Sequence, residues 1–355
     1  MSGRLAVGIV LVAGLFVRAA DLRAQSAILN LPRTSQHARI TQRIGIVDIT
    51  IDYHRPLASG RKVFGGLQAY GDVWRAGANE NTTIEVSDAV SVEGQALSKG
   101  IYGLHMIPGE ASWIVIFSKN STSWGSFTYD TKEDALRVTV KSAAIPHHEA
   151  LSYDFDEPTD RSVVVTMRWE KQAVAFRINV DTPAIVQRSL RDQLRARGQF
   201  EWQPWMEAAT YLLANHLDAA EAADDLGKSI AIEDRFENEL TLAWALGAVG
   251  RKSDASAAWA KGMAMGSQAQ IHAFARGLQA QGLRDEALEL FRENMRKDAA
   301  SWVGHNEAAR LAVAAGDFET AVKEMKLAET ASPDALRSQH TDLVRRLQHR
   351  EDINR

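Results

Sequence analysis

Residues 53–83 read YHRPLASGRKVFGGLQAYGDVWRAGANENTT, an irregular run rich in glycine, arginine, aromatic and amide residues. Connections within compact domains usually span about 4–6 residues, so this run is too long to be a simple loop. Long irregular segments of this kind are commonly functional or structured in their own right. We therefore expect a site in this part of the chain.

Short strands are expected on both sides of this run. Just before it, every second residue is apolar or glycine, as in a half-buried strand: Gly45, Val47, Ile49, Ile51 and Tyr53. After it, turn residues separate strands expected at Thr83–Val86, Val90–Val92, Ile101–Ile107, Trp113–Phe117, Leu136–Lys141, Leu151–Phe155, Ser162–Trp169 and Ala173–Val180. The last two are expected to form a hairpin through Glu170-Lys171-Gln172. With a polar lead-in at residues 26–37, this pattern predicts an antiparallel β-sandwich or open barrel over residues 26–180.

The pattern changes to helix at Asp181-Thr182-Pro183, where Asp or Thr can cap a helix and Pro fits its first turn. Residues 183–355 then carry a repeated spacing of glycine, alanine five positions on, and a large apolar residue four positions later. The copies are Gly250, Ala255 and Trp259; Gly282, Ala287 and Phe291; and Gly316, Ala321 and Met325. A degenerate first copy is Leu217, Ala222 and Leu226.

These copies lie 33, 32 and 34 residues apart, which is the period of helix–turn–helix repeats. The glycine would end the first helix, the alanine would let the second helix approach, and the large residue would fill the gap between them. The segment therefore resembles tetratricopeptide repeats (TPR), and about four helix pairs with a polar closing helix at Asp334–Arg350 are predicted. A helical bundle with the same spacing is the alternative. The expected fold is a two-domain α+β protein.

Composition limits the classes of function. The chain has 355 residues, 45% of them hydrophobic, and a formal net charge of −4, which are values of an ordinary globular protein without a reason to bind nucleic acid. It contains no cysteine, so disulfides, thiolate metal sites and a cysteine nucleophile are excluded.

Residues 1–24 have the features of a secretory signal peptide: Arg4, then 13 apolar or glycine residues, then small residues. The apolar run is shorter than the roughly 20 residues of a spanning helix. Cleavage is expected near Ala20, Ala24 or Gln25. This predicts an exported chain, periplasmic or secreted, with no stable membrane span once cleaved; an uncleaved membrane anchor is the alternative.

Known catalytic patterns are missing from the sequence. There is no G-x-S-x-G, no phosphate-binding loop and no dinucleotide fingerprint. His147-His148-Glu149 is the only cluster of metal-ligand residues, and a solvated loop end explains it better than a metal site. We therefore expect no metal and no cofactor.

The candidate ligand site lies at Trp74–Thr83. Arg75, Asn79 and Glu80 supply a planar cation, an amide and a carboxylate within six positions. Trp74 adds a flat apolar face, and Arg61 lies nearby in sequence. Such groups suit a small polar ligand or carbohydrate, and we expect them to share one solvent-accessible concavity.

The same residues permit two other interpretations. A hydrolase could use Glu80 as acid or base and Arg75 as an electrostatic clamp, with His54 or His105 transferring protons. Alternatively, Arg75 and Glu80 pair internally and only fix a long crossover, which makes the segment a scaffold.

Several motifs resemble one bacterial family. They are Y-x-R-P at Tyr53–Pro56, G-R-x-x-F-G at Gly60–Gly65, Y-G-x-V-W-R-x-G-A-N-E-x-T at Tyr70–Thr82 and G-x-Y-x-L at Gly100–Leu104. Residues of about 35–180 resemble the family of domain of unknown function 2911, with His54 at a position where a small residue is expected. The resemblance implies an exported β-domain, often followed by helical repeats, and no established activity. We therefore predict a ligand- or partner-binding protein with a protein partner at the repeats.

Overall fold

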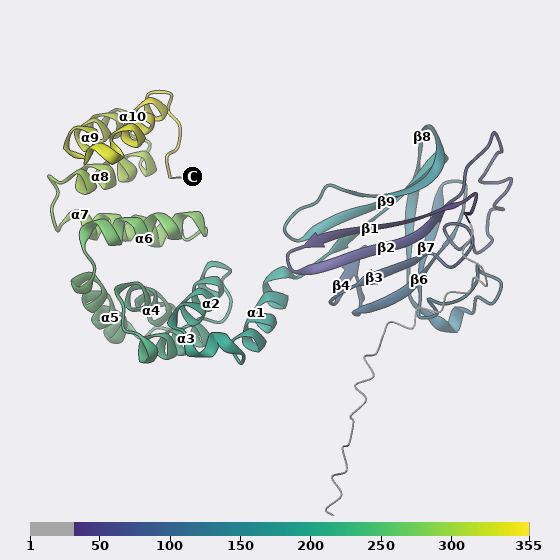
Figure 1. The fold of residues 1–355 in the computed structure, drawn as a ribbon, viewed down its shortest axis with the longest axis horizontal. Coiled ribbons are helices and arrows are strands. Elements are labelled where there is room, and N and C mark those ends of the chain that lie inside the picture. The colour runs from purple at the N-terminus through teal and green to yellow at the C-terminus, as the bar shows by residue number, and fades with distance from the viewer. Residues whose placement is uncertain (1–31, 355) are drawn as a thin grey trace, which may run out of the picture. The chain divides into compact units, whose positions relative to one another are not determined.

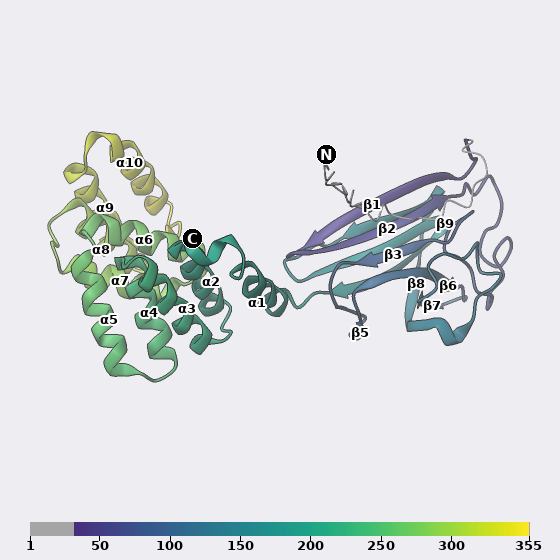
Figure 2. The same cartoon turned by 60° about the horizontal axis from the view of Figure 1, so that its bottom comes forward.

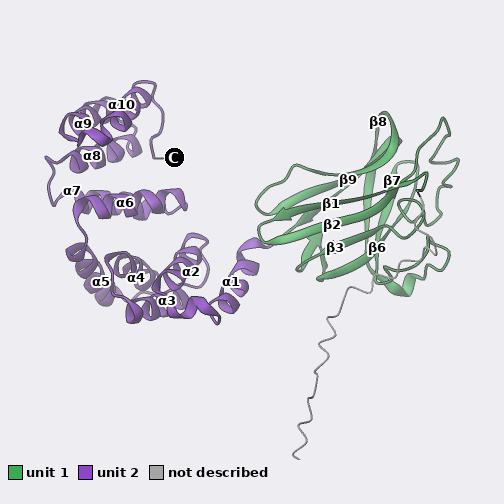
Figure 3. Ribbon diagram, in the orientation of Figure 1, with its two compact units in different colours: residues 1–180 green, residues 181–355 purple. Residues whose placement is uncertain are grey.

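The computed structural model describes residues 32–354 and divides the chain into two compact units between Val180 and Asp181 (Figure 3). We call residues 32–180 the β unit and residues 181–354 the helical unit. The predicted signal peptide, residues 1–24, lies outside the described residues.

The β unit is one antiparallel sheet (Figure 1 and Figure 2). Its strands are β1 (Gln36–Ile44), β2 (Val47–Arg55), β3 (Thr83–Val86), β4 (Val90–Val92), β5 (Gln95–Leu97), β6 (Gly100–Ile107), β7 (Ser112–Ser118), β8 (Asp134–Asp156) and β9 (Ser162–Asn179). They are hydrogen-bonded in the order β1-β2-β3-β6-β7-β8-β9-β4-β5. The predicted antiparallel β-rich first half is confirmed.

The apolar residues that alternate along β2 face the core, as predicted. Val47, Ile49 and Ile51 are fully buried and Tyr53 is 3% exposed. The strand β1, which pairs with β2 along its whole length, was not predicted. It is an edge strand with polar residues such as Arg39 and Arg43, so it has little apolar alternation to reveal it.

The predicted hairpin at Arg161–Val180 is wrong, because β9 runs without a break from Ser162 to Asn179. Glu170 has a positive φ of 54°, but the strand continues through it. The register between β8 and β9 shifts on both sides of His148, so bulges absorb the turn-like residues and bend the strands. The connection that reverses the chain is residues 157–161 instead.

The long strand β8 carries the chain from one part of the sheet to the other. Residues 134–141 pair with β7, and residues 142–156 pair with β9. The predicted strands at Leu136–Lys141 and Leu151–Phe155 are therefore parts of one strand. The crossover after β2 also returns to β8, where Leu57 faces Ala150 in an antiparallel bridge.

An aromatic cluster in the core fixes the crossover at residues 56–82. Trp74 stacks on Trp169 with ring centroids 5.6 Å apart, and Phe64 meets Trp113 edge-on at 4.6 Å. Each of these four residues is at most 4% exposed. The backbone N–H of Trp74 also donates to Met106 O in β6, at 2.8 Å. The crossover is thus packed into the core, and the side chains next to Trp74 have fixed positions.

The helical unit contains α1 (Thr182–Gln193), α2 (Trp202–Ala214), α3 (Ala219–Ile232), α4 (Phe236–Ala248), α5 (Lys252–Met265), α6 (Gln268–Ala280), α7 (Arg284–Met295), α8 (Trp302–Ala314), α9 (Phe318–Ala331) and α10 (Asp334–Gln348). Asp181 caps α1, with Pro183 in its first turn, as predicted. The pairs α2/α3, α4/α5, α6/α7 and α8/α9 correspond to the four predicted repeats, and α10 follows them as the closing helix.

The turn inside each pair uses a left-handed residue. Gly250, Gly282 and Gly316 have φ of 80°, 91° and 79°, as the repeat predicts. In the first pair this residue is His216, with φ of 52°, so the assignment to Leu217 is wrong. Leu217 instead follows it and donates its N–H to Leu212 O, and the loop is one residue longer than in the other pairs.

The alanine and the large apolar residue of each repeat lie where the second helix packs. Three copies are fully buried: Ala222 and Leu226, Ala287 and Phe291, and Ala321 and Met325. In the second copy, Ala255 and Trp259 are only half-buried. The predicted TPR-like arrangement is confirmed by this geometry, and one of its junctions differs from the others.

Candidate functional site

The backbone of the candidate segment is held from the inside. The indole N–H of Trp74 donates to Gly77 O at 3.1 Å, and the hydroxyl of Tyr153 donates to Ala76 O at 2.8 Å. Ala76 and Asn79 both adopt a positive φ, 51° and 59°. This tight, buried turn presents the side chains of Arg75, Asn79 and Glu80 together at the edge of the core.

Arg75 is half-buried. Its guanidinium donates to Asn79 O and lies 5.9 Å from the ring centroid of Phe127. Gly125 has a φ of 69°, and a Cβ there would come within 2.7 Å of Arg75 Nη1, so another residue would be strained and would displace the guanidinium. Burial lowers the pKa of Arg75, and the Glu80 carboxylate opposes that shift.

Glu80 forms an ion pair that the sequence did not reveal. Both of its oxygens accept from Arg33 Nη1, at 2.6 and 2.7 Å, and one lies 3.4 Å from His54 Nε2. Burial works to raise the pKa of Glu80, but the hydrogen bonds from Arg33 and its own backbone, with the nearby charges, hold it below its ordinary value. Glu80 is therefore ionised at neutral pH.

The two histidines occupy different environments. His54 contacts Glu80, and burial lowers its pKa although the Glu80 charge opposes this. His105 is 2% exposed, its Nδ1 lies 2.9 Å from Ser126 Oγ, and burial lowers its pKa to about 4. Since Glu80 is held ionised by Arg33 and His105 is held neutral, the geometry lends no support to a proton-transfer role for Glu80.

The other predicted ligand-site residues lie elsewhere. Trp74 is 4% exposed and stacked on Trp169, so its face is covered and cannot stack on a ligand. Arg61 donates to Leu57 O and Ala58 O. It lines a separate hollow of about 480 Å³ with Tyr70 and other residues. The structure thus brings together Arg75, Asn79, Glu80 and His54, but not all five predicted ligand contacts.

Two exposed aromatic rings border this group. Phe127 is 82% exposed, and Trp124 is 46% exposed with the Arg33 guanidinium 5.8 Å from its ring centroid. We call Arg33, Arg75, Glu80, Trp124 and Phe127 the aromatic–arginine patch. The sequence did not predict the place of Trp124 and Phe127 in this patch, because their contacts with Arg33 and Arg75 join residues far apart in the chain.

The helical unit contains a second candidate site, which binds the C-terminal segment of the chain itself. Ile353 and Asn354 are 1% and 6% exposed. Arg310 Nη1 of α8 donates to Ile353 O at 2.6 Å, and Gln279 Nε2 of α6 donates to Asn354 Oδ1 at 3.0 Å. Asn354 Nδ2 in turn donates to Arg310 O at 2.9 Å. The repeat thus holds a turn-forming segment, residues 351–354, through its main-chain carbonyl and an amide side chain.

Arg310 is the central residue of this tail site. It is 3% exposed, and its Nε also donates to Asn306 Oδ1 at 2.8 Å. Burial lowers its pKa to about 9, with the neighbouring charge of Arg276 acting in the same direction. A buried guanidinium needs hydrogen-bond acceptors, and the Ile353 carbonyl is one of them.

Within residues 32–354 there is no group of three or more acidic or histidine side chains placed to hold a metal ion. The same part of the chain has no helix with the length and apolar character required to cross a membrane.

The fold and these contacts define a two-unit protein, an antiparallel β unit followed by a TPR-like helical unit. Residues 35–178 match the model of the family described as "Protein of unknown function (DUF2911)", which confirms the family predicted from the motifs. A search of curated proteins found no match.

Solved structures with helical repeats also match. One is described as "Crystal structure of MamA", with 14% identity, 46% of this chain and 92% of that chain covered, and a TM-score of 0.26. Another is described as "YrrB: a TPR protein with an unusual peptide-binding site", with 15% identity, 45% and 84% coverage, and a TM-score of 0.24. Scores this low support no functional argument.

The buried His105 should make the β unit sensitive to acid. Its folded pKa is about 4 against an ordinary value of 6.5. Between these values the unfolded chain binds more protons, so stability falls as pH falls, by about 3 kcal/mol between pH 7 and pH 4. The variant His105→Gln lacks this titration. Between pH 7 and pH 4 its free energy of unfolding should therefore fall by about 3 kcal/mol less than that of the unchanged protein. Urea unfolding of the β unit at both pH values measures the difference.

The control is His349→Gln, which removes an exposed histidine just after α10 that forms no ion pair within residues 32–354. It should keep the pH dependence of the unchanged protein. If His105→Gln and the unchanged protein show the same pH dependence of stability, His105 is not the source of the acid sensitivity.

Proposed function

We propose that the protein is an exported binding protein whose helical unit binds a short peptide segment of a partner protein. The observation that carries this proposal is the tail site. There, side chains from α6 and α8 hold Ile353 and Asn354 through hydrogen bonds to a main-chain carbonyl and to a side-chain amide. A site that holds such a segment of its own chain has the donors, acceptors and apolar space to hold one from another protein.

The chemistry of the tail site also limits what can replace the tail. Release of the tail leaves the Arg310 guanidinium and the Gln279 amide without these acceptors, and unmet buried donors cost about 1–3 kcal/mol each. A replacement must therefore supply a carbonyl oxygen for Arg310 and an amide for Gln279. A segment with an apolar residue followed by asparagine, in a turn like that of Ile353 and Asn354, meets both requirements.

A synthetic peptide with the sequence of residues 349–355 tests this function. It should bind a chain from which residues 353–355 have been removed, and it should bind the intact chain more weakly, because the tail competes for the site. Changing the asparagine of the peptide to alanine removes two hydrogen bonds, so the affinity should fall about tenfold or more. Isothermal titration calorimetry measures both affinities.

Circular dichroism establishes that the shortened chain is folded. As a second route, Asn354→Ala in the intact chain weakens the tail and should admit the unaltered peptide. If the shortened chain and the Asn354→Ala variant are both folded and neither binds the peptide, the proposed function is contradicted.

A second function is favoured by the aromatic–arginine patch. We propose that the β unit binds a small polar ligand or carbohydrate there, with Arg75, Asn79 and Glu80 supplying polar contacts. The supporting observation is the exposure of the Phe127 and Trp124 rings beside Arg75 and Arg33, since exposed aromatic faces next to planar polar groups suit sugars.

Thermal-shift screening of the protein against sugars, peptidoglycan fragments and nucleotides tests the ligand site. Phe127→Ala should abolish the shift produced by any ligand while changing stability by less than about 0.5 kcal/mol, because the ring is 82% exposed. Phe200→Ala removes a ring of 74% exposure from the helical unit and is the matched control. A ligand shift that survives in both Phe127→Ala and Trp124→Ala would contradict this site.

Export is the remaining part of the proposal. Its support is the sequence of residues 1–24, with a basic residue, a short apolar run and small residues. Amino-terminal sequencing of the mature protein tests it, and we expect a start just after Ala20, Ala24 or Gln25. A mature chain that retains Arg4 would contradict cleavage.

A further inference from the structure

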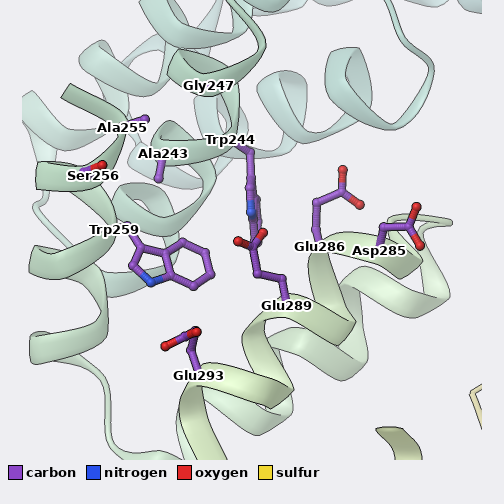
Figure 4. Close-up of a pocket in the computed structure, with 10 residues that line it drawn as sticks. All are labelled: Ala243, Trp244, Gly247, Ala255, Ser256, Trp259, Asp285, Glu286, Glu289 and Glu293. Carbon is purple, nitrogen blue, oxygen red and sulfur yellow. The ribbon is translucent and has the colours of Figure 1, made fainter. Parts of the chain in front are cut away.

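The helical unit contains a pocket of about 610 Å³ between its second and third helix pairs (Figure 4). Its lining combines two indole rings, Trp244 of α4 and Trp259 of α5, with four carboxylates of α7: Asp285, Glu286, Glu289 and Glu293. Neither the tail site nor the aromatic–arginine patch includes any of these residues.

The pocket exists because one junction of the repeat is more open than the others. The helices α3 and α4, α7 and α8, and α9 and α10 pack closely, whereas α5 and α6 do not. Across this junction Trp244 lies 6.4 Å from Phe274 of α6, and within the second pair it lies 6.1 Å from Trp259, as measured between ring centroids. These rings pack against a buried cluster that α4 and α6 share through residues such as Leu240 and Ile271.

The other repeats act as an internal comparison. The residues at the positions of Ala255 and Trp259 are fully buried in the first, third and fourth copies. In the second copy both residues are half-buried and line the pocket. Trp259 thus occupies a position that is buried in the other three repeats, and its indole ring is accessible to a ligand.

The acidic side of the pocket is not fully explained by helix stability. Asp285 and Glu286 lie in the first turn of α7, where carboxylates stabilise a helix through its dipole. Glu289 and Glu293 lie further along the helix, where that explanation does not apply. Glu293 pairs with Arg296 at 2.6 Å. Among the described residues, Asp285, Glu286 and Glu289 form no ion pair.

The indoles supply the complementary half of a cation site. Figure 4 shows the Trp259 ring and the Glu293 carboxylate directed into the same space, with Trp244 at its border. The Nε1 atom of Trp244 is buried and has no acceptor among the described residues. An indole face attracts a cation through its quadrupole, and a guanidinium can stack on the ring while its N–H groups reach carboxylates.

We propose that this pocket binds an arginine side chain of a basic segment in a partner protein. This inference rests on the proposed function of the helical unit and names the chemistry of the partner. The arginine stacks on Trp259 and pairs with Glu289. Lysine binds more weakly, because its ammonium group cannot stack as a plane.

A fluorescein-labelled peptide of alternating arginine and serine, added to the intact protein at physiological salt, tests the pocket by fluorescence anisotropy. Glu289→Gln and Trp259→Ala should each weaken binding about tenfold. Glu319→Gln removes the same charge from an exposed position on α9 and should change the affinity less than twofold. The lysine–serine peptide should bind more weakly than the arginine–serine peptide.

Three results would overturn the inference: no binding at millimolar peptide, equal weakening by Glu289→Gln and Glu319→Gln, or unchanged affinity in both pocket variants. Glu289→Gln changes no packed group, so it remains informative if Trp259→Ala fails to fold. The peptide of residues 349–355 binds the tail site independently. If that peptide binds the shortened chain while the basic peptide fails, only the pocket inference is wrong; if neither binds, the proposed function fails too.

Discussion

The helical unit depends on one backbone constraint, a left-handed residue between the two helices of each pair. This residue lets the next backbone N–H bond back to the first helix, which fixes how the second helix leaves the turn. Three pairs use glycine, whereas His216 accepts a strain of about 1–2 kcal/mol in the first pair. Because the turn is repeated, the alanine and the large apolar residue are buried in the same way in the first, third and fourth pairs, whereas Ala255 and Trp259 of the second pair line a pocket.

The two sites of the helical unit are opposite in chemistry. In the tail site, a buried cation, Arg310, meets a carbonyl oxygen of the chain itself. In the pocket, Glu293 pairs with Arg296, whereas Asp285, Glu286 and Glu289 form no ion pair within residues 32–354. A partner that uses both sites would offer a basic side chain to one and a carbonyl with an amide to the other. The β unit builds its own patch differently, since the aromatic cluster around Trp74 fixes the backbone that carries Arg75 and Glu80.

Sequence patterns predicted the structural features that depend on residues close together in the chain. The burial of Ile49 and Ile51 and the left-handed turn at Gly282 follow from alternation and period. The hairpin at Glu170-Lys171-Gln172 did not form, because pairing with β8 through bulges outweighs the turn composition. Arg75, Asn79 and Glu80 were predicted to converge because one tight turn joins them. Arg33 lies 47 residues from Glu80, and the exposure of Trp259 depends on what the next helix pair covers, so neither could be predicted from sequence.

The central claim is that the helical unit is a binding element whose tail site opens while the repeat stays folded. Hydrogen exchange of the intact protein, resolved by NMR, measures this most directly. If the tail opens locally, the backbone N–H of Asn354 exchanges at a lower free energy than the buried backbone N–H groups of α8. Our account predicts that difference. Exchange of Asn354 only together with α8, at the free energy of global unfolding, would show that the tail is a permanent part of the core and would contradict the account.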